Sequence, residues 1–313
     1  MNDLISLNLT APALPERRNP ALVYLSSLQP KGRRSMASSL ESIAQLCGFT
    51  LRTMPWHKLH YEHVQAIVTK LSETLAPATV NKGLAAIRGT MKAAWRLKLI
   101  SAEDYARVHD VRLIKGSRLP TGRQLSEGEI FALFSTTSKD KSPAGIRDLA
   151  ILALSYAAGL RRAEVASLDF DQLKEEEDFI TIRLIGKGNK ERLVYLNNGA
   201  RDALKAYLSI RGSDAGPLFY AGRKGGKLIE KQRMTDQAIY GVLLKRAKDA
   251  NVDNVTPHDL RRTFVSNMLD IGIDLATVSA LAGHANVQTT ARYDRRGEES
   301  KKKAARALRV PLE

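Results

Sequence analysis

Residues 258–261 read His-Asp-Leu-Arg, residues 283–284 read Gly-His, and a tyrosine stands at position 293. These elements fall in the last third of a chain of 313 residues. Arginine binds phosphate oxygens through two parallel hydrogen bonds, histidine exchanges a proton near neutral pH, and tyrosine carries a hydroxyl that can act as a nucleophile. Together these residue types predict a site for phosphoryl transfer.

Two upstream stretches extend the pattern. Residues 159–164 read Gly-Leu-Arg-Arg-Ala-Glu, and residues 186–192 read Gly-Lys-Gly-Asn-Lys-Glu-Arg. The order of these blocks closely resembles that of the tyrosine recombinase (phage integrase) family, and within it the Xer-type recombinases. The resemblance covers residues 120–297 through the motifs, and the helical region before them through size and pattern only. It identifies the catalytic residues as Arg161, Lys187, His258, Arg261, His284 and Tyr293.

The resemblance implies a fold and a division of the chain. The fold is mainly α with a small antiparallel sheet: an N-terminal helical-bundle (SAM-like) core-binding domain, then a catalytic domain with the DNA breaking-rejoining fold. In related recombinases a tail after the tyrosine docks on a neighbouring subunit, and a disordered basic tail is the alternative. The expected parts are a flexible arm (1–18), the helical core DNA-binding domain (19–111), a linker (112–123), the catalytic domain (124–297) and the C-terminal tail (298–313).

The resemblance also implies roles for the catalytic residues. Tyr293 attacks phosphorus and forms a 3′-phosphotyrosyl bond while a 5′-hydroxyl leaves. Arg161 and Arg261 neutralise the phosphate oxygens, because a guanidinium group keeps its charge and donates two hydrogen bonds. Lys187 is the acid for the leaving oxygen, with Lys190 as the fallback. A lysine between two glycines is often only a solvent-exposed turn residue, so that interpretation stays open for Lys187.

Two histidines and a glutamate complete the expected site. His258 takes or returns the proton of the nucleophile, and His284 donates a ring N–H to a phosphate oxygen. Glu164, one turn after Arg161, orients an arginine or only solvates its helix. The sequence has no acidic cluster of the kind that holds two metals in nucleases. We therefore expect no metal and no cofactor, and no ATP because the covalent intermediate conserves the energy of the phosphodiester bond.

The charge balance independently indicates a polyanionic partner. The chain has 49 Lys and Arg against 33 Asp and Glu, a net charge of +16. Residues 1–120 carry 17 basic and 8 acidic residues, and residues 121–313 carry 32 and 25. Because each neutralised phosphate releases counterions, a protein that grips a duplex from two sides needs positive charge on both parts. The expected DNA contacts are Arg33, Arg34, Lys82, Arg88, Lys92, Lys190, Arg192, Arg223, Lys224, Lys227 and Arg262.

Other features of the sequence indicate where in the cell the protein is located. Cys47 is the single cysteine, so no disulfide can form within the chain. The start of the chain lacks the basic segment and apolar core of a signal peptide, and the longest apolar stretch, near residues 149–160, is too short to span a bilayer. We expect a cytoplasmic, nucleoid-associated protein with no membrane partner.

Hydrophobic periodicity predicts helices in both parts of the chain. In the first part it predicts four helices: one that begins at Asn19, and three that cover residues 36–46, 61–71 and 78–98. In the second part, Ser126 and Glu129 predict a capping box, residues 144–158 a buried helix, and the residues after Arg161 a continuation of that helix to Leu168. Residues 179–184 and 191–196 flank a Gly-Lys-Gly-Asn turn and predict a hairpin.

The expected partner is a double-stranded DNA recombination site. By resemblance, the two domains clamp the duplex, two protomers bind one site as a dimer, and two sites meet in a tetramer that exchanges strands through a Holliday junction. A second recombinase or accessory protein is compatible with this scheme. Chromosome dimer resolution, plasmid maintenance, phage integration and transposon movement all use this chemistry. Two alternatives remain: a type IB topoisomerase-like enzyme that rejoins the original strand, and a non-catalytic DNA-binding protein of the same fold.

Overall fold

The computed structural model describes residues 14–116, 122–185, 191–223, 225–284, 286–291 and 293. The chain forms two compact units, residues 1–120 and 121–313. The boundary between them falls within the expected linker, residues 112–123. The expected C-terminal tail and most of the expected arm lie outside the described residues. No helix among the described residues is long and apolar enough to cross a membrane.

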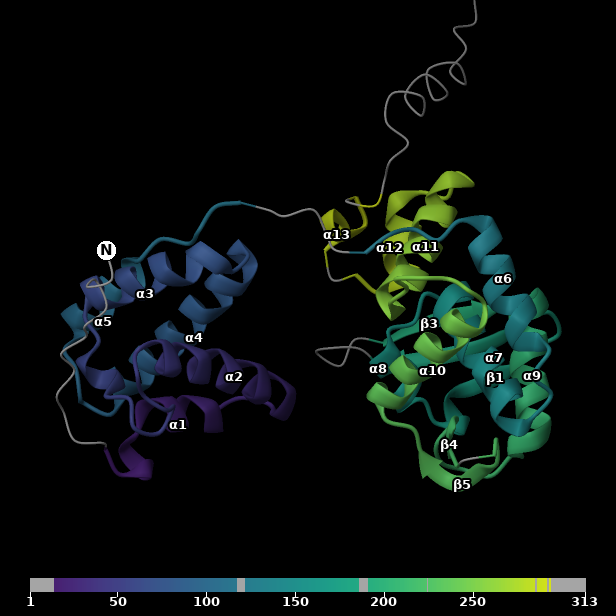
Figure 1. The fold of residues 1–313 in the computed structure, drawn as a ribbon, viewed down its shortest axis with the longest axis horizontal. Coiled ribbons are helices and arrows are strands. Elements are labelled where there is room, and N and C mark those ends of the chain that lie inside the picture. Colours follow the sequence, from purple (N-terminus) through teal and green to yellow (C-terminus); the bar gives the residue numbers. More distant parts are fainter. Residues whose placement is uncertain are drawn as a thin grey trace, which may run out of the picture. The chain divides into compact units, whose positions relative to one another are not determined.

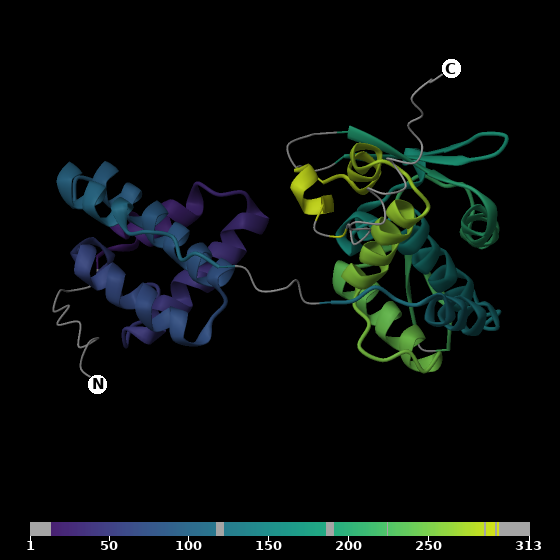
Figure 2. The ribbon, with the colours of Figure 1, turned by 90° about the horizontal axis from the view of Figure 1, so that it is seen from above.

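Unit 1 is a bundle of helices gathered around α4 (Pro77–Arg96), as Figure 1 and Figure 2 show. Buried residues of α4, among them Leu84, Ile87 and Met91, line one face of the helix and form the centre of the core. Short 3₁₀ turns occur at Glu16–Arg18 and Trp56–Lys58. The helices that contact α4 are α1 (Pro20–Ser26), α2 (Pro30–Leu46), α3 (Tyr61–Thr74) and α5 (Ala102–Asp110).

The four expected helices of unit 1 are confirmed, but α5 was not predicted. Its N-terminus carries a capping signal, because the Ser101 side chain accepts a hydrogen bond from the backbone N–H of Asp104 at 3.0 Å. Only Val108 of this helix is fully buried. A nine-residue helix with one buried apolar side chain has too little periodicity to be recognised from its sequence.

Unit 2 is mainly helical with two small antiparallel sheets, which confirms the expected fold class (Figure 1). In the first sheet β2 lies between β1 and β3, and β2 pairs with β3 from Ile180 opposite Leu196 to Ile185 opposite Glu191. The second sheet, β4–β5, was not predicted, because β4 has three residues and β5 exposes most of its side chains. The strands are β1 (Leu173–Glu175), β2 (Ile180–Ile185), β3 (Glu191–Leu196), β4 (Tyr220–Gly222) and β5 (Leu228–Arg233).

The helices of unit 2 surround α7 (Pro143–Ala157), which contacts five of them. Most of α7 is buried, as its apolar sequence predicts. The expected capping box is confirmed, since Ser126 and Glu129 bond reciprocally at the start of α6. The other helices are α6 (Glu127–Ser138), α8 (Arg162–Ser167), α9 (Asn198–Arg211), α10 (Asp236–Asp249), α11 (Pro257–Asp270), α12 (Leu275–Ala282) and α13 (Val287–Ala291), with a 3₁₀ turn at Phe170–Gln172.

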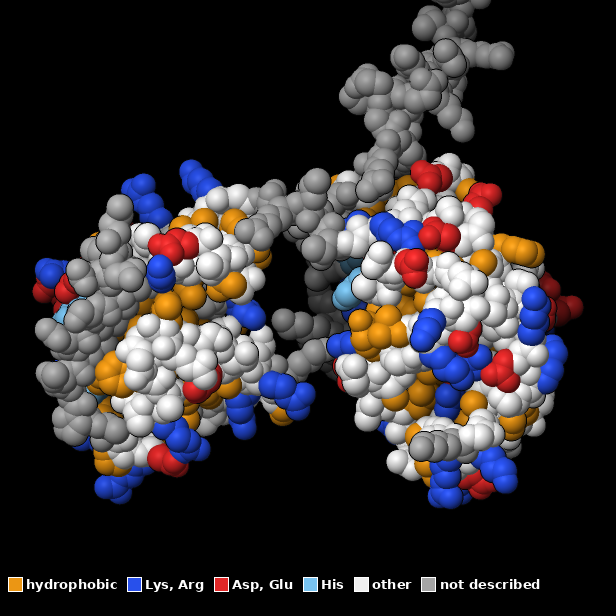
Figure 3. All heavy atoms as spheres, viewed as in Figure 1, with side chains coloured by type: hydrophobic (Ala, Val, Ile, Leu, Met, Phe, Trp, Pro, Cys, Tyr) orange, Lys and Arg blue, Asp and Glu red, His pale blue; other side chains and the backbone are white. Residues whose placement is uncertain are grey.

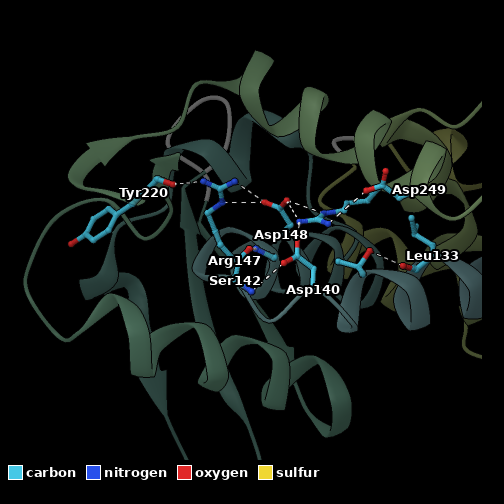
Figure 4. A network of polar contacts seen from close by, with 10 residues as sticks. Leu133, Asp140, Ser142, Arg147, Asp148, Tyr220 and Asp249 are labelled. Carbon is cyan, nitrogen blue, oxygen red and sulfur yellow. Dashed lines mark hydrogen bonds and ion pairs between the residues drawn. The ribbon is translucent and has the colours of Figure 1, made fainter. Parts of the chain in front are cut away.

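A buried ionic network fixes α7 to its neighbours (Figure 4). Asp148 lies between two arginines: its Oδ1 accepts from the Arg147 guanidinium at 2.7 Å and its Oδ2 from Arg246 of α10 at 2.8 Å. Arg147 also donates to the carbonyl of Tyr220 in β4 at 2.9 Å. A buried charge without a partner is strongly destabilising, so these bonds fix α10 and β4 against α7.

The expected helix through Arg161 is wrong. Helix α7 ends at Ala157, and α8 begins only at Arg162. Gly159 lies between them with a φ of +58°, and a Cβ atom at this position would stand 2.4 Å from the Phe264 ring. The close approach of Phe264 and the left-handed turn both require glycine there. Arg161 is therefore the extended N-cap residue of α8 rather than part of a continuous helix.

Candidate active site

Arg161 is the N-cap residue of α8, and its side chain is held by its own helix and by the end of α12. Its guanidinium donates to Oε1 of Glu164 at 2.9 Å and to the carbonyl of Gly283 at 3.1 Å. Its backbone N–H donates to the other oxygen of Glu164 at 2.8 Å, as in a capping box. The side chain is 38 % exposed, so its charge remains accessible to a ligand.

Arg261 projects from α11 and is almost fully buried. Its guanidinium donates to the carbonyl of Gly159 at 2.6 Å and to the carbonyl of Ala282. Burial, together with the nearby charge of Arg161, lowers the pKa of Arg261 to about 10. The group therefore stays charged at neutral pH.

The C-terminus of α12 connects the two arginines. The carbonyl of Ala282 accepts from Arg261, and the next carbonyl, that of Gly283, accepts from Arg161. The C-terminal end of a helix carries partial negative charge on its free carbonyls, which favours cations. Gly283 ends α12 in the left-handed conformation, with a φ of +65°. One helix end therefore places both guanidinium groups.

Glu164 is shared between Arg161 and Arg192. Each of its oxygens accepts from the guanidinium of Arg192, which donates at 2.9 and 3.2 Å from β3. Burial acts to raise the pKa of Glu164, but the hydrogen bonds and charges of the two arginines outweigh it and the pKa is lowered. Arg192 was expected to contact DNA, whereas its side chain is 14 % exposed and bound to Glu164.

The N-terminus of α11 carries His258 at the protein surface. The helix begins with a capping box in which Thr256 and the buried Asp259 bond reciprocally. Desolvation by neighbouring protein atoms, followed by the positive charges of Arg261 and Arg161, lowers the pKa of His258. A neutral imidazole at the edge of a cationic cluster is able to accept a proton.

Tyr293 and His284 form a stacked pair. Their ring centroids are 6.2 Å apart, and the ring planes differ by 20°. His284 Nδ1 lies 2.7 Å from the hydroxyl of Thr290, a buried residue of α13 that sequence reasoning missed. Burial, then the charges of Arg261 and its neighbouring arginines, lowers the pKa of His284 to about 4. Tyr293 itself is partly buried against the apolar cluster around Phe264.

Arg262, which was also expected to contact DNA, points into the protein. Its side chain is buried, and it donates to the carbonyl of Gly122. Its guanidinium carbon lies 5.2 Å from the centroid of the Tyr293 ring, a cation–π arrangement. Arg261 and Arg262 therefore point to different neighbours, as adjacent helical residues must.

The remaining expected DNA contacts are divided between exposed and partly buried positions. Arg88 is partly buried and donates to the carbonyl of Val111. Figure 3 shows basic side chains over the β4–β5 ribbon, where Arg223 and Lys227 are exposed. Within the described ranges, no group of three or more His, Cys, Asp or Glu side chains could hold a metal ion. The other exposed positions are Arg33, Arg34, Lys82 and Lys92, while Lys187, Lys190 and Lys224 lie outside the described residues.

The low pKa of His284 has a consequence for stability. His284 has a pKa of about 4 in the folded protein against an ordinary value of 6.5, so the unfolded chain takes up this proton first as the pH falls. The contribution of the neutral His284 ring to the free energy of unfolding is therefore complete above pH 6.5 and is lost as the pH falls toward 4. We expect the free energy of unfolding to fall between pH 7 and pH 5 through this group, by less than the full pKa difference implies because the ring is partly exposed and solvent screens its interactions. Urea unfolding at the two pH values should show a smaller fall in His284→Gln, and equal falls in both proteins would contradict the assignment.

Comparison with known proteins identifies the family. Residues 123–299 match the sequence profile of the phage integrase family. The tyrosine recombinase XerC of Thermodesulfovibrio yellowstonii is 31 % identical over 75 % of this chain and 79 % of its own length, and that of Roseiflexus castenholzii is 28 % identical over 89 % and 88 %. A similar fold is found in the XerH site-specific recombinase, whose structure is a post-cleavage complex with a palindromic difH substrate. The TM-score is 0.65, and the identity is 18 % over 96 % of this chain and 91 % of that one. The chain therefore belongs to the phage integrase family, the tyrosine recombinases.

Proposed function

We propose that the chain is a site-specific DNA recombinase that cleaves and rejoins strands through a 3′-phosphotyrosyl intermediate and a Holliday junction. One observation carries the proposal: Tyr293 is stacked on His284, whose pKa is lowered by burial and by the nearby charges of Arg261 and Arg161. A binding protein would not need a tyrosine hydroxyl beside two anchored arginines.

The two arginines are suited to hold the scissile phosphate. Attack at phosphorus increases the negative charge on the nonbridging oxygens, and charged donors fixed in advance stabilise that charge. Arg161 and Arg261 are fixed by the carbonyls of Gly283, Gly159 and Ala282. Because carbonyls carry no net charge, these bonds hold the guanidinium groups without neutralising them, although Arg161 also bonds the carboxylate of Glu164.

The nucleophile must lose its proton during the attack. A free tyrosine has a pKa of about 10, so very little phenolate is present at neutral pH. His258 is accessible and has a lowered pKa, so it is neutral and ready to accept the proton. We assign it as the base for cleavage and as the acid for the reverse step.

His284 serves as a neutral hydrogen-bond donor in this scheme. Its pKa of about 4 keeps the ring uncharged at neutral pH. When the Thr290 hydroxyl donates to Nδ1, the ring proton is on Nε2, from which it can be donated to a phosphate oxygen. A neutral donor suits a site in which the arginines already supply the charge.

The leaving 5′-oxygen needs a proton because an alkoxide is a poor leaving group. We assign this role to Lys187, in the segment that follows β2 in the chain, with Lys190 as the alternative. The support is the family motif and the position of the hairpin: β3 brings Arg192 to Glu164, and thereby connects to Arg161.

The substrate is a double-stranded recombination site, bound by a dimer and brought together with a second site in a tetramer. The exposed basic residues on both units, such as Lys82 and Arg223, supply charge for the phosphate backbone. We assign core-site binding to residues 19–111, catalysis to residues 124–297, and subunit docking to residues 298–313. We expect the protein in the cytoplasm, associated with the nucleoid, because its proposed substrate is chromosomal or episomal DNA.

Strand exchange between two sites tests the function. Two duplexes of different length, each carrying the candidate site, are incubated with the protein and resolved by size. A recombinase gives products of new length, whereas a topoisomerase-like enzyme relaxes a supercoiled plasmid without forming them. DNA binding with neither product nor relaxation on sites recovered by footprinting would leave only the non-catalytic alternative.

A further inference from the structure

Glu164 carries hydrogen bonds from two arginines at once. Oε1 accepts from the guanidinium groups of Arg161 and Arg192, at 2.9 and 3.2 Å. Oε2 accepts from the backbone N–H of Arg161 and from the Arg192 guanidinium, at 2.8 and 2.9 Å. The carboxylate is therefore bound to one arginine from the catalytic set and to one from β3.

Arg192 is fixed from a second direction by Gly283. A Cβ atom at position 283 would lie 2.6 Å from the Arg192 guanidinium carbon, so the guanidinium lies directly against the backbone of this glycine. The carbonyl of the same glycine accepts from Arg161. Arg192 thus contacts both Glu164 and Gly283, the two residues that hold the Arg161 guanidinium.

The charges of the three side chains decide what Arg192 contributes. A carboxylate that bonded Arg161 alone would orient it but would also neutralise it, because the pair has no net charge. With Arg192 included, the three groups carry a net charge of +1. In a partly desolvated site this difference acts directly on a bound anion, since electrostatic interactions there are weakly screened.

We propose that Arg192 is a positioning residue for strand cleavage: it holds Glu164 in place and offsets its charge, so that Glu164 orients Arg161 without cancelling it. The inference rests on the proposed function, in which Arg161 binds the scissile phosphate. Arg192 itself does not touch the DNA in this assignment.

Charge compensation distinguishes this role from a DNA contact. In Arg192→Met the negative charge of Glu164 is opposed only by Arg161, which it then neutralises. Cleavage of bound DNA should therefore slow by about 10- to 100-fold, the usual cost of losing a supporting partner. The double variant Glu164→Gln/Arg192→Met removes the unbalanced charge and should recover about tenfold of that loss. Arg192→Lys keeps the charge and should cleave faster than Arg192→Met.

The measurement is single-turnover adduct formation on a nicked site with protein in excess, alongside DNA affinity at two salt concentrations. Arg183→Met, on the exposed face of β2, is the matched control and should cleave at the wild-type rate. A thermal melt of each variant identifies any that does not fold. If Arg192→Met does not fold, Arg192→Lys is compared with Glu164→Gln/Arg192→Lys instead. Because the lysine already offsets the charge of Glu164, the double variant should then cleave no faster than Arg192→Lys.

Two results would overturn the inference. One is a double variant no faster than Arg192→Met, and the other is a loss of affinity with a shallower salt dependence in Arg192→Met, which marks a direct phosphate contact. If the wild-type protein itself forms no adduct, the proposed function fails instead. The two failures are therefore distinguishable.

Discussion

The Tyr293→Phe variant is expected to form no denaturant-resistant adduct with DNA and to yield no recombinant product. Phenylalanine keeps the ring that stacks on His284 and lies under Arg262, so the packing is retained. It lacks the oxygen that would form the phosphotyrosyl bond, and a missing nucleophile cannot be compensated by the arginines. The assay is gel electrophoresis under denaturing conditions after incubation with a nicked site.

The control for this variant is a tyrosine outside the site. Tyr195 of β3 is 49 % exposed, and Tyr195→Phe removes one hydroxyl from the same unit. Wild-type protein and Tyr195→Phe should both form the adduct, and all three proteins should bind DNA. An adduct that persists in Tyr293→Phe would show that another residue is the nucleophile.

The Arg261→Lys variant is expected to lower the cleavage rate by about 10²- to 10³-fold, the usual cost of losing one fixed donor to developing charge. A lysine ammonium lacks the planar fork of arginine, so it cannot bond the Gly159 and Ala282 carbonyls and also offer two parallel donors to phosphate. The other cations remain, so DNA affinity should change much less than the rate. Single-turnover cleavage and equilibrium binding measure the two effects.

A matched substitution separates this effect from a general loss of arginine. Arg233 also donates to two backbone carbonyls, those of Ala166 and Leu168, but it lies on β5. Arg233→Lys should therefore cleave at the wild-type rate. A similar loss of rate in both variants would indicate that the reduced activity comes from a weakened fold rather than from the phosphate site.

The sequence alone was sufficient to predict features that depend on residues close together in the chain. The family and the mainly helical fold are confirmed by the comparisons and the structure. The capping box at Ser126 was predictable because its partner is three residues away. The β2–β3 hairpin was predictable because alternation and a glycine-rich turn are both local signals.

Features that depend on distant partners could not be predicted. The break before Arg161 follows from the approach of Phe264, about one hundred residues later in the chain. Arg192 and Arg262 were assigned to DNA because they are basic residues beside catalytic motifs. Only the fold shows that they turn inward, toward Glu164 and Tyr293 respectively.

The carbonyl anchors of Arg161 and Arg261 also have an entropic consequence. An arginine side chain that is free in solution loses as much as about 2 kcal/mol of conformational entropy when it is immobilised. Here the backbone carbonyls of Gly159, Ala282 and Gly283 already restrict both side chains. This loss therefore occurs once, when the protein folds, and does not recur each time a recombination site is bound.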